Sequence, residues 1–349
     1  MTSRSEFTVP TIDIGPYLSP TADAATRAAT ARSLDTACRE VGFVQVVGHG
    51  VAPQAQADLA AAMDEFFALP AELKVPCRRA PGDNRGYAPP KSESLSASLG
   101  LVSANKMNDF YEAYTVGTER SAFQELDLPA SSYADNNWPA AAPGFRPAVE
   151  RWFAEMQQLS RALLRACTDA LDLPAGFFDP LVDHSIDALK MNNYTLPEGE
   201  IELAGELTGM GAHTDFGILT VLWADQVPGL QVLGRDGTWH DVQPADGALL
   251  LNLGDAMARW TNDKWMSTVH RVDPPVVDGR IIRRRSAAFF FDGNFDAVIE
   301  TLPGCAREDR PGYPPITVAE NIAMKVAGLK GTAVPSADMR ETRRVLAAQ

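Results

Sequence analysis

Residues 211–220, with the sequence GAHTDFGILT, place His213 and Asp215 one residue apart. Side chains alternate between the two faces of an extended strand, so this imidazole and this carboxylate point to the same side. Both groups can bind one cation. Because two ligands alone hold a metal weakly, we expect a third ligand from elsewhere in the chain, and we treat the other elements as supports for this segment.

The third ligand is expected among the five histidines of the chain. His49 lies in a Gly-His-Gly turn, His184 near the end of a helical stretch, and His240 in a predicted hairpin. His270 instead ends a predicted strand within residues 265–272, WMSTVHRV, and is favoured. Two histidines and one carboxylate on one face of a metal, with other positions open, form the arrangement of non-haem Fe(II) oxygenases.

A second candidate site lies in residues 282–291, IRRRSAAFFF, which indicate an apolar, aromatic-rich strand. Alternation places Arg284 and Ser286 on one face and Arg283 and Arg285 on the other. A guanidinium beside a hydroxyl can bind a carboxylate through charge-assisted hydrogen bonds. Taken alone, the run also fits a basic edge strand paired with surface acids, just as an HxD pair with a distant histidine fits ordinary surface or core residues.

The HTD motif at residues 213–215, the HRV motif at residues 270–272 and the pair Arg284 and Ser286 stand in the order and spacing of one protein family. On these residues the chain resembles the isopenicillin N synthase-like branch of the Fe(II)/2-oxoglutarate-dependent dioxygenases. The resemblance extends almost end to end, through the segments VPTID (9–13), GFVQVVGHGV (42–51), FFALP (66–70), RGY (85–87) and NLGD (252–255).

The resemblance implies roles for particular residues. His213, Asp215 and His270 are implied as the ligands of Fe(II), and Arg284 and Ser286 as the residues that bind the distal carboxylate of 2-oxoglutarate. Dioxygen is the third reactant, and ascorbate is a candidate reductant.

A further element that the resemblance implies is Asn-x-Tyr, here Asn192 and Tyr194, which helps to hold the cosubstrate. The family's usual Tyr-Pro ending is replaced by YTLP at residues 194–197, so the local backbone is expected to differ.

The substrate is expected to lie against aromatic residues. Phe216 follows Asp215 directly, and Phe290 shares a strand face with Arg284 and Ser286. An apolar wall with one or two polar anchors is typical of a small-molecule site, and it indicates a substrate with a hydrophobic body and an acidic group facing Arg85. The resemblance brings four N-terminal residues toward the mouth of the site: Arg85, Tyr87, Phe110 and Tyr114. Arg85 paired with a surface acid, and an ordinary connection with inward aromatics at residues 109–114, remain the alternatives.

Composition limits the partners. The net charge of −14, from 31 basic and 45 acidic residues, would repel a nucleic acid backbone. The sequence shows neither a leader pattern nor an apolar run of membrane-spanning length, so we expect a cytoplasmic protein without a membrane partner. The four cysteines lack CxxC spacing and fit reduced thiols. We expect a monomer or a weak homo-oligomer that binds a small-molecule substrate.

The chain reads as helices followed by strands. Expected N-terminal strands are residues 9–14 and 43–47, and residues 76–98 are expected to be a loop. Helices are expected at residues 22–40, 53–69, 145–171, 177–183 and 318–329. Further strands are expected at residues 189–194, 218–223, 230–233, 248–253, 269–272 and 283–291, with hairpin turns at Asp236-Gly237 and Asp278-Gly279.

This order predicts a mixed α/β (α+β) fold, a distorted jelly roll or double-stranded β-helix wrapped by N-terminal and long central helices. We divide the chain into an N-terminal helical and strand region (1–120), a long helix with its connections (121–188), a dioxygenase β-helix core (189–300) and a C-terminal helical tail (301–349). The tail from Asp338 is a candidate cover for the open mouth of the jelly roll.

Three functions compete. The favoured one is an oxygenase that couples oxidative decarboxylation of 2-oxoglutarate to succinate and CO2 with hydroxylation, desaturation or ring formation on a small organic molecule, either a specialised metabolite or an amino-acid derivative. The second is an iron-dependent oxidase of the same family that does not use 2-oxoglutarate. The third is a catalytically silent binding protein. The fold alone does not choose the substrate.

Overall fold

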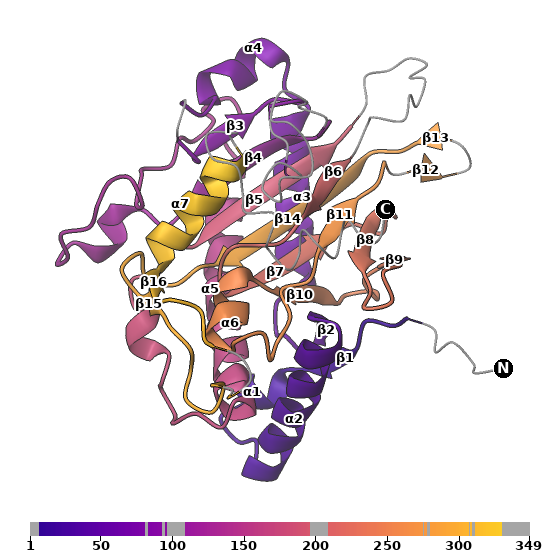
Figure 1. The fold of residues 1–349 in the computed structure, drawn as a ribbon. Coiled ribbons are helices and arrows are strands. Elements are labelled where there is room, and N and C mark those ends of the chain that lie inside the picture. The colour runs from indigo at the N-terminus through magenta and orange to yellow at the C-terminus, as the bar shows by residue number, and fades with distance from the viewer. Residues whose placement is uncertain are drawn as a thin grey trace.

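The computed structural model describes residues 7–80, 83–92, 95, 109–195, 209–274, 276–277, 280–306, 308 and 311–329 (Figure 1). Within these residues the longest strands form an eight-stranded sheet in the order β1-β2-β10-β7-β14-β5-β4-β3. In that order the strands are β1 (Thr11–Asp13), β2 (Phe43–Val47), β10 (Leu249–Leu253), β7 (Leu219–Ala224), β14 (Arg284–Phe291), β5 (Ala188–Tyr194), β4 (Glu112–Gly117) and β3 (Gly86–Ala88).

A smaller sheet faces the large one. It has the order β6-β11-β8-β9, with β6 (Met210–His213), β11 (His270–Val272), β8 (Leu230–Leu233) and β9 (Trp239–Asp241). An apolar cluster between the sheets joins Val232 and Val272 of the small sheet to Phe43 and Leu250 of the large one. The described residues also contain two short hairpin-like pairs, β12 (Val276–Val277) with β13 (Arg280–Ile281) and β15 (Val298–Ile299) with β16 (Ile316–Thr317).

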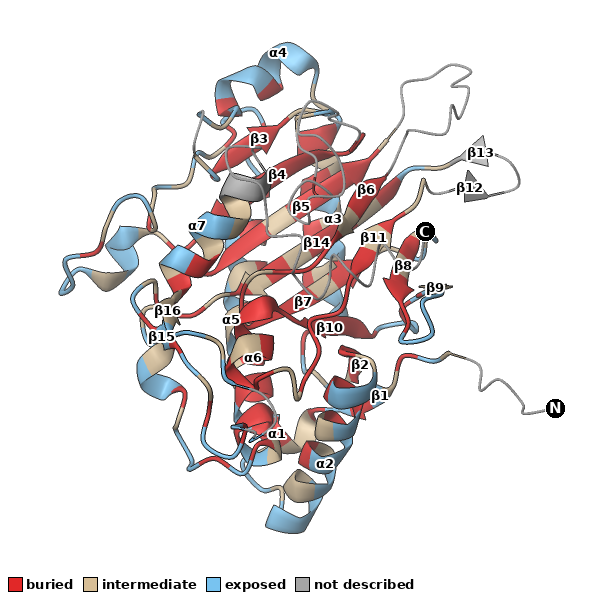
Figure 2. Cartoon of the chain, in the orientation of Figure 1, coloured by how far each residue is buried: buried red, intermediate tan, exposed pale blue. Residues whose placement is uncertain are grey.

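Helices cover the other face of the large sheet. The long helix α5 (Phe145–Ala170) contacts β14 and β7, and it packs against α2 (Ala24–Glu40) and α3 (Pro53–Phe67). Its apolar stripe recurs at three- and four-residue steps and buries Trp152, Met156 and Leu163. Each such side chain contributes about 1.5–3 kcal/mol when it leaves water. The sheet strands and the inner side of α5 are accordingly buried (Figure 2).

The unit of α2 followed by β2 shows why the chain turns where it does. The side chain of Asp23 accepts a 2.8 Å hydrogen bond from the backbone N–H of Thr26 and so caps the start of α2. After the helix, Gly42 has φ of +72°, a conformation that favours glycine. A Cβ at this position would also lie 2.4 Å from the carbonyl oxygen of Met266. Gly42 therefore directs the chain straight into β2.

The remaining helices are shorter than α2, α3 and α5. They are α1 (Gly15–Leu18), α4 (Ala71–Lys74), α6 (Asp255–Trp260) and α7 (Val318–Leu329), with three-residue or four-residue 3-10 turns at Val75–Cys77, Arg120–Phe123 and Asp179–Leu181. In Figure 1, α6 and α7 lie on the viewer's side of the large sheet, opposite α3 and α5.

Most expected elements are present, and the mixed α/β fold with a jelly-roll core is confirmed. Three expectations were wrong. Residues 177–183 form only the 3-10 turn Asp179–Leu181, because Val182 leaves the helical conformation with φ of −138°. The expected loop at 76–98 contains β3, and the irregular region after it contains β4. Asp215 lies just beyond the end of β6 at His213, and not within the strand.

The described residues include one of the two expected hairpin turns. The Asp236-Gly237 turn joins β8 to β9 as predicted, with Gly237 at φ of +76°. Asp278 and Gly279 lie outside the described residues, although β12 and β13 on either side of them pair. The tail from Asp338 also lies outside the described residues. The division of the chain into four regions stays a prediction.

Candidate active site

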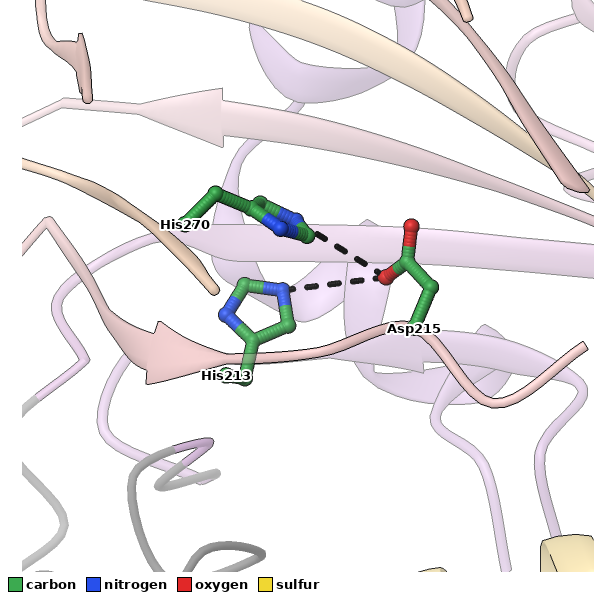
Figure 3. Close-up of side chains that lie close together, drawn as sticks. All are labelled: His213, Asp215 and His270. Atoms are coloured by element: carbon green, nitrogen blue, oxygen red, sulfur yellow. Dashed lines mark ion pairs between the residues drawn. The ribbon is translucent and has the colours of Figure 1, made fainter. Parts of the chain in front are cut away.

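The two sheets bring His213, Asp215 and His270 together (Figure 3). His213 at the end of β6 pairs with His270 at the start of β11. The Nε2 atoms of His213 and His270 lie 3.9 Å and 3.8 Å from Oδ1 of Asp215. All three side chains are buried, and in the described part of the chain they form the one cluster of three whose ligand atoms lie within 4.8 Å of one another.

Hydrogen bonds orient each of the three groups. Nδ1 of His213 lies 2.8 Å from the carbonyl oxygen of Gly211, and Nδ1 of His270 lies 3.1 Å from that of Thr268. A carbonyl oxygen only accepts, so the proton of each neutral ring is on Nδ1 and the lone pair of each Nε2 faces Asp215.

The carboxylate of Asp215 is held from its other side. Its Oδ2 accepts hydrogen bonds of 2.6 Å from the hydroxyl of Thr220 on β7 and 2.7 Å from Nδ2 of Asn252 on β10. Oδ1 is left free to face the two imidazoles. Three lone pairs, from two nitrogens and one oxygen, therefore converge on one point.

The electrostatics of the cluster favour metal binding. Burial and the neighbouring imidazole of His270 lower the pKa of His213 to about 3, so its ring is neutral at physiological pH. Burial alone would raise the pKa of Asp215, but the two imidazoles and the hydrogen bonds from Asn252 and Thr220 outweigh it and lower that pKa. A metal needs neutral imidazoles and an ionised carboxylate. Two nitrogens and one carboxylate oxygen match the donor set of non-haem Fe(II) sites.

A second set of polar residues lies on β14 and β5, on the face of the large sheet that looks toward the metal cluster. Arg284 pairs with Tyr194, and Ser286 pairs with Asn192. The Arg284 guanidinium is 2% exposed and lies 5.2 Å from the centre of the Tyr194 ring. Its Nε donates a 3.3 Å hydrogen bond to the carbonyl oxygen of Val227, while Nη1 has no partner.

Arg284 therefore carries a buried charge that has no ion pair among the residues described here. Next to it, Nδ2 of Asn192 lies 3.4 Å from the Ser286 hydroxyl, and Oδ1 of Asn192 has no partner. Burial raises the pKa of Tyr194 to about 12, so its hydroxyl stays protonated. An unpaired buried charge is costly, and a bound carboxylate would satisfy it.

One row of side chains links this face to the metal cluster. The register aligns Gly117 (β4), Ala188 (β5), Phe290 (β14), Thr220 (β7), Asn252 (β10) and Phe43 (β2). Thr220 and Asn252 bond Asp215, and the Phe43 ring lies edge-on to His270 at 5.3 Å between centroids. Phe290, half-buried in the same row, is thus on the metal side of the sheet.

Two of the residues expected to face the substrate do not do so. Tyr87 and Tyr114 pair with each other, and both point into the helix-covered core. The Tyr87 hydroxyl donates a 2.7 Å hydrogen bond to Glu112, and the Tyr114 ring lies edge-on to Phe66 at 4.7 Å. The prediction was wrong because β4 was not expected, and strand alternation sends Tyr114 away from the site.

The other four residues that were expected to face the substrate occupy separate positions. Phe110 is buried between the sheets, edge-on to Tyr194 at 6.3 Å. Phe216 follows Asp215 and is half-buried. Arg85 is 2% exposed, and Phe290 stands in the row described above. Their contact with a substrate stays a prediction.

The C-terminal helix α7 holds the metal-binding segment from outside. Nδ2 of Asn321 donates a 2.9 Å hydrogen bond to the carbonyl oxygen of Phe216. Nζ of Lys325 lies 2.7 Å from Oδ2 of Asp255, which also accepts a 3.2 Å hydrogen bond from the Thr214 hydroxyl. Phe216, which follows Asp215, is therefore bonded to α7 directly. Thr214, which precedes Asp215, is bonded to Asp255, the ion-pair partner of Lys325 in α7.

Sequence reasoning missed these supporting residues. Thr220 stands within the segment 211–220, and Asn252 and Asp255 stand within the NLGD segment, so their proximity in the chain to recognised motifs was an available signal. The contact of Lys325 with Asp255 had no signal, since it joins distant parts of the chain.

Comparisons with known proteins match both halves of the chain. The family described as non-haem dioxygenase in morphine synthesis N-terminal matches residues 9–141, and the 2OG-Fe(II) oxygenase superfamily matches residues 186–293. In the described part of the chain, no helix combines the length and the apolar character that a membrane span requires.

Among the relatives, the 2-oxoglutarate-Fe(II) type oxidoreductase hxnY of Emericella nidulans is 34% identical over 90% of this chain and 88% of its own length. Validamycin A dioxygenase of Streptomyces hygroscopicus subsp. limoneus is 31% identical over 91% of this chain and 85% of its own. A solved full-length Neurospora crassa protein in complex with alpha-ketoglutarate and thymine has a TM-score of 0.79 and 27% identity, with 93% of this chain and 98% of that chain covered. Together with the buried cluster of two histidines and an aspartate, these matches establish that the chain belongs to the 2OG-Fe(II) oxygenase superfamily and is an oxidoreductase that uses Fe(II), 2-oxoglutarate and dioxygen.

Proposed function

We propose that His213, Asp215 and His270 hold one Fe(II) ion. The observation that carries this proposal is the convergence of three lone pairs, each fixed by a hydrogen bond on the far side of its own group. The rings need not rotate to bind the metal, so little free energy is spent on reorganisation.

We also propose that Arg284 and Ser286 bind the distal carboxylate of 2-oxoglutarate. The free Nη1 of Arg284 and the Ser286 hydroxyl lie on one strand face, two residues apart. Asn192 offers an unpartnered Oδ1 beside them, and the Tyr194 ring packs against the guanidinium. A planar, charged donor at the end of a buried site fits a carboxylate better than it fits a neutral group.

Bound Fe(II) supplies the activation of dioxygen, and the balanced overall hydroxylation converts a substrate C–H bond, dioxygen and 2-oxoglutarate into an alcohol, succinate and CO2. The residues of this chain position the reactants and exclude water. His213, Asp215, His270, Arg284 and Ser286 are all buried, so bulk water has little access to the metal or to the cosubstrate.

The substrate is proposed to be a small organic molecule, a specialised metabolite or an amino-acid derivative. Phe290 stands in the same row as Thr220 and on the same strand face as Arg284, and Phe216 adjoins the ligand Asp215, so an apolar or aromatic body would find two ring surfaces. Relatives named for activity on small molecules, validamycin A dioxygenase among them, support this class.

One measurement tests the proposed function without a known substrate. Anaerobically purified protein, loaded with Fe(II) and 2-oxoglutarate, is mixed with oxygenated buffer, and succinate is quantified by NMR. Slow succinate formation that requires Fe(II) and is absent in Asp215→Ala is expected. Oxygen consumption without succinate would favour an oxidase that does not use 2-oxoglutarate, and no consumption with any member of a metabolite pool would favour a silent binding protein.

A further inference from the structure

Two arginines are buried in the described part of the chain, and each has a nitrogen without a partner there. Arg85 and Arg284 are both 2% exposed, and the unpartnered atoms are Nε of Arg85 and Nη1 of Arg284. A buried charge is costly unless it is paired, so each guanidinium marks a place for an acceptor. The carboxylate of 2-oxoglutarate, as proposed above, satisfies Arg284. The acceptor for Arg85 is still to be assigned.

Arg85 lies on the face of the large sheet that carries the metal cluster. It precedes β3, and its guanidinium lies against Gly117 of β4, where a Cβ would be 2.3 Å from Cζ of Arg85. Strand alternation sends Tyr114 to the helix-covered core, so Gly117, three residues later, faces the opposite side. The glycine therefore leaves room for the guanidinium on the site face of the sheet.

The strand register gives the position of Arg85 relative to the metal cluster. Gly117 belongs to the row that continues through Phe290 to Thr220, whose hydroxyl supports the carboxylate of the cluster. Three strand spacings separate Gly117 from Thr220, which is about 14 Å. Arg284 lies at the other end of β14 from Phe290, about 20 Å along the strand. Arg85 and Arg284 are thus too far apart to bind one carboxylate.

The acids around Arg85 do not pair with it. Within the described residues its side chain makes one hydrogen bond, of 2.7 Å, from Nη1 to Oδ1 of Asn84. Oδ1 of Asp83 accepts a 3.1 Å bond from the backbone N–H of Arg85, and Oε1 of Glu119 accepts a 2.7 Å bond from that of Asn136. Burial lowers the pKa of Arg85 more than the surrounding carboxylates raise it. The guanidinium edge formed by Nε and Nη2 is therefore open.

We propose that Arg85 binds a carboxylate of the substrate, and that the apolar or aromatic body of the substrate lies along Phe290, between Arg85 and the metal cluster. This inference rests on the proposed function, because it places the substrate in the same site. The two oxygens of a carboxylate match the open edge of the guanidinium and supply the negative charge that Arg85 lacks. Asp292 does not oppose that charge, because burial raises its pKa to about 8 and keeps it mainly protonated at physiological pH.

Charge balance also favours a carboxylate at Arg85. Fe(II) and Arg284 would balance Asp215 and the two carboxylates of 2-oxoglutarate, so the proposed metal and cosubstrate site is neutral without Arg85. A neutral substrate would leave the buried guanidinium without an opposite charge, whereas a monocarboxylate would neutralise it. The single open edge also suits a carboxylate better than a phosphate, which offers more acceptors than this edge has donors.

Two probes that differ in charge test the proposal: phenylacetate and its amide, phenylacetamide. Saturation-transfer NMR is recorded on Zn(II)-loaded protein that is saturated with 2-oxoglutarate, so that neither probe binds at Arg284. Phenylacetate is expected to bind about tenfold more tightly, the usual difference between a charge-assisted and a neutral hydrogen bond. Equal binding, tighter binding of the amide, or no binding of phenylacetate would each contradict the proposal.

Variants show whether Arg85 causes this preference. Arg85→Met should abolish it, and Arg85→Lys should keep part of it, because the charge remains without the planar pair of donors. Gly117→Ala places a Cβ where the guanidinium lies, so it should weaken the preference with the charge intact. Arg283→Met, which alters a residue paired with Asp64 on the opposite face, is the control and should bind both probes normally. A full preference in Arg85→Met would mean that another cation binds the carboxylate.

The alternative is that Arg85 supports the fold and binds nothing. A structural role alone would not distinguish phenylacetate from its amide, so the preference separates the two ideas. If circular dichroism shows that Arg85→Met does not fold, Arg85→Lys and Gly117→Ala decide the question. An undiminished preference in both of these variants would overturn the proposal.

Paramagnetic relaxation tests the orientation of the bound probe. With Mn(II) in the proposed metal site, the ring protons of phenylacetate should relax faster than its methylene protons, because Arg85 holds the carboxylate at the far end of the row. Faster relaxation of the methylene protons would place the carboxylate at the metal. Faster methylene relaxation, or no enhancement of either signal, would contradict the proposal.

Metal content and 2-oxoglutarate binding, measured on the same samples, keep the two levels of inference apart. Loss of probe preference in unaltered protein that still binds metal and 2-oxoglutarate refutes only the role of Arg85. Failure of the unaltered protein to bind metal or 2-oxoglutarate refutes the proposed function itself.

Discussion

The hydroxyl of Thr220 donates a 2.6 Å hydrogen bond to Oδ2 of Asp215, the residue five positions earlier in the chain. The chain leaves β6, turns at Gly217 and returns as β7, so the support of the carboxylate comes from the next strand. Asn252 on β10 adds the second bond. The orientation of Asp215 is therefore set by the large sheet, whereas both histidines belong to the small one.

Removing these bonds should weaken metal binding without removing a ligand. Thr220→Val and Asn252→Ala are each expected to lower Fe(II) affinity roughly 10–100-fold, because the carboxylate is then free to rotate. Anaerobic titration with Fe(II) measures the affinity. Thr220→Ser keeps the hydroxyl and serves as the control that should bind like the unaltered protein. Equal affinity in Thr220→Val and Thr220→Ser would mean that the bond does not orient the metal ligand.

Loss of a proposed ligand should have a larger effect. His270→Ala is expected to reduce Fe(II) affinity by more than the roughly 10–100-fold typical of an outer hydrogen-bond partner, and to abolish succinate formation. Metal addition should raise the unfolding temperature of the unaltered protein and leave that of His270→Ala unchanged, since only a bound ion stabilises the native state. The control is His240→Ala, whose ring stacks on Phe7 at the surface. Normal iron binding in His270→Ala would refute the assignment.

Arg284 should not be replaceable by lysine. Arg284→Lys keeps the charge but loses the planar pair of donors, so KM for 2-oxoglutarate is expected to rise about 10–100-fold. Ser286→Ala removes one neutral hydrogen bond and should raise KM by about 2–10-fold. Arg283→Lys, which alters a residue paired with Asp64 on the opposite face, is the matched control. An unchanged KM in Arg284→Lys would show that the carboxylate of the cosubstrate binds elsewhere.

The contact of α7 with the metal-binding segment predicts an effect from a residue that is not a ligand. Lys325→Met leaves the buried Asp255 without its ion pair, and Asp255 bonds Thr214 beside Asp215. We expect Fe(II) affinity to fall by less than the roughly 10–100-fold typical of a direct hydrogen-bond partner of a ligand, because Lys325 acts through Asp255 and Thr214. Lys325→Arg should restore most of it, and the exposed neighbour Met324→Ala should have no effect. If Lys325→Met lowered only the unfolding temperature, α7 would support the fold alone.

Local sequence patterns were sufficient for much of this structure. Strand alternation placed Arg284 and Ser286 on one face, and the run ending at His270 identified the third member of the metal cluster before any fold was known. The rule could not be applied to Tyr114, which the resemblance brought toward the site, because a six-residue strand rich in small residues was not recognised and its faces could not be assigned. Face assignment requires that the strand be recognised first.

Contacts between distant segments left no local signal. Lys325 meets Asp255, and Arg85 lies against Gly117, only because separate elements pack together. Unsatisfied atoms are likewise visible only in the folded chain, since any arginine in a sequence has potential partners. The free Nη1 of Arg284 and the free Nε of Arg85 became informative once burial had removed those partners.

The row from Gly117 through Phe290 to Phe43 constrains how such an enzyme can change during evolution. Inserting or deleting one residue between Ser286 and Phe290 in β14 would turn one end of the strand over relative to the other, so Phe290 would no longer share a face with Arg284 and Ser286. Exchanging a side chain within the row, by contrast, changes one position and preserves the rest. New substrate preferences in this lineage should therefore arise by point substitution along the row, while insertions and deletions accumulate in the connections outside the large sheet.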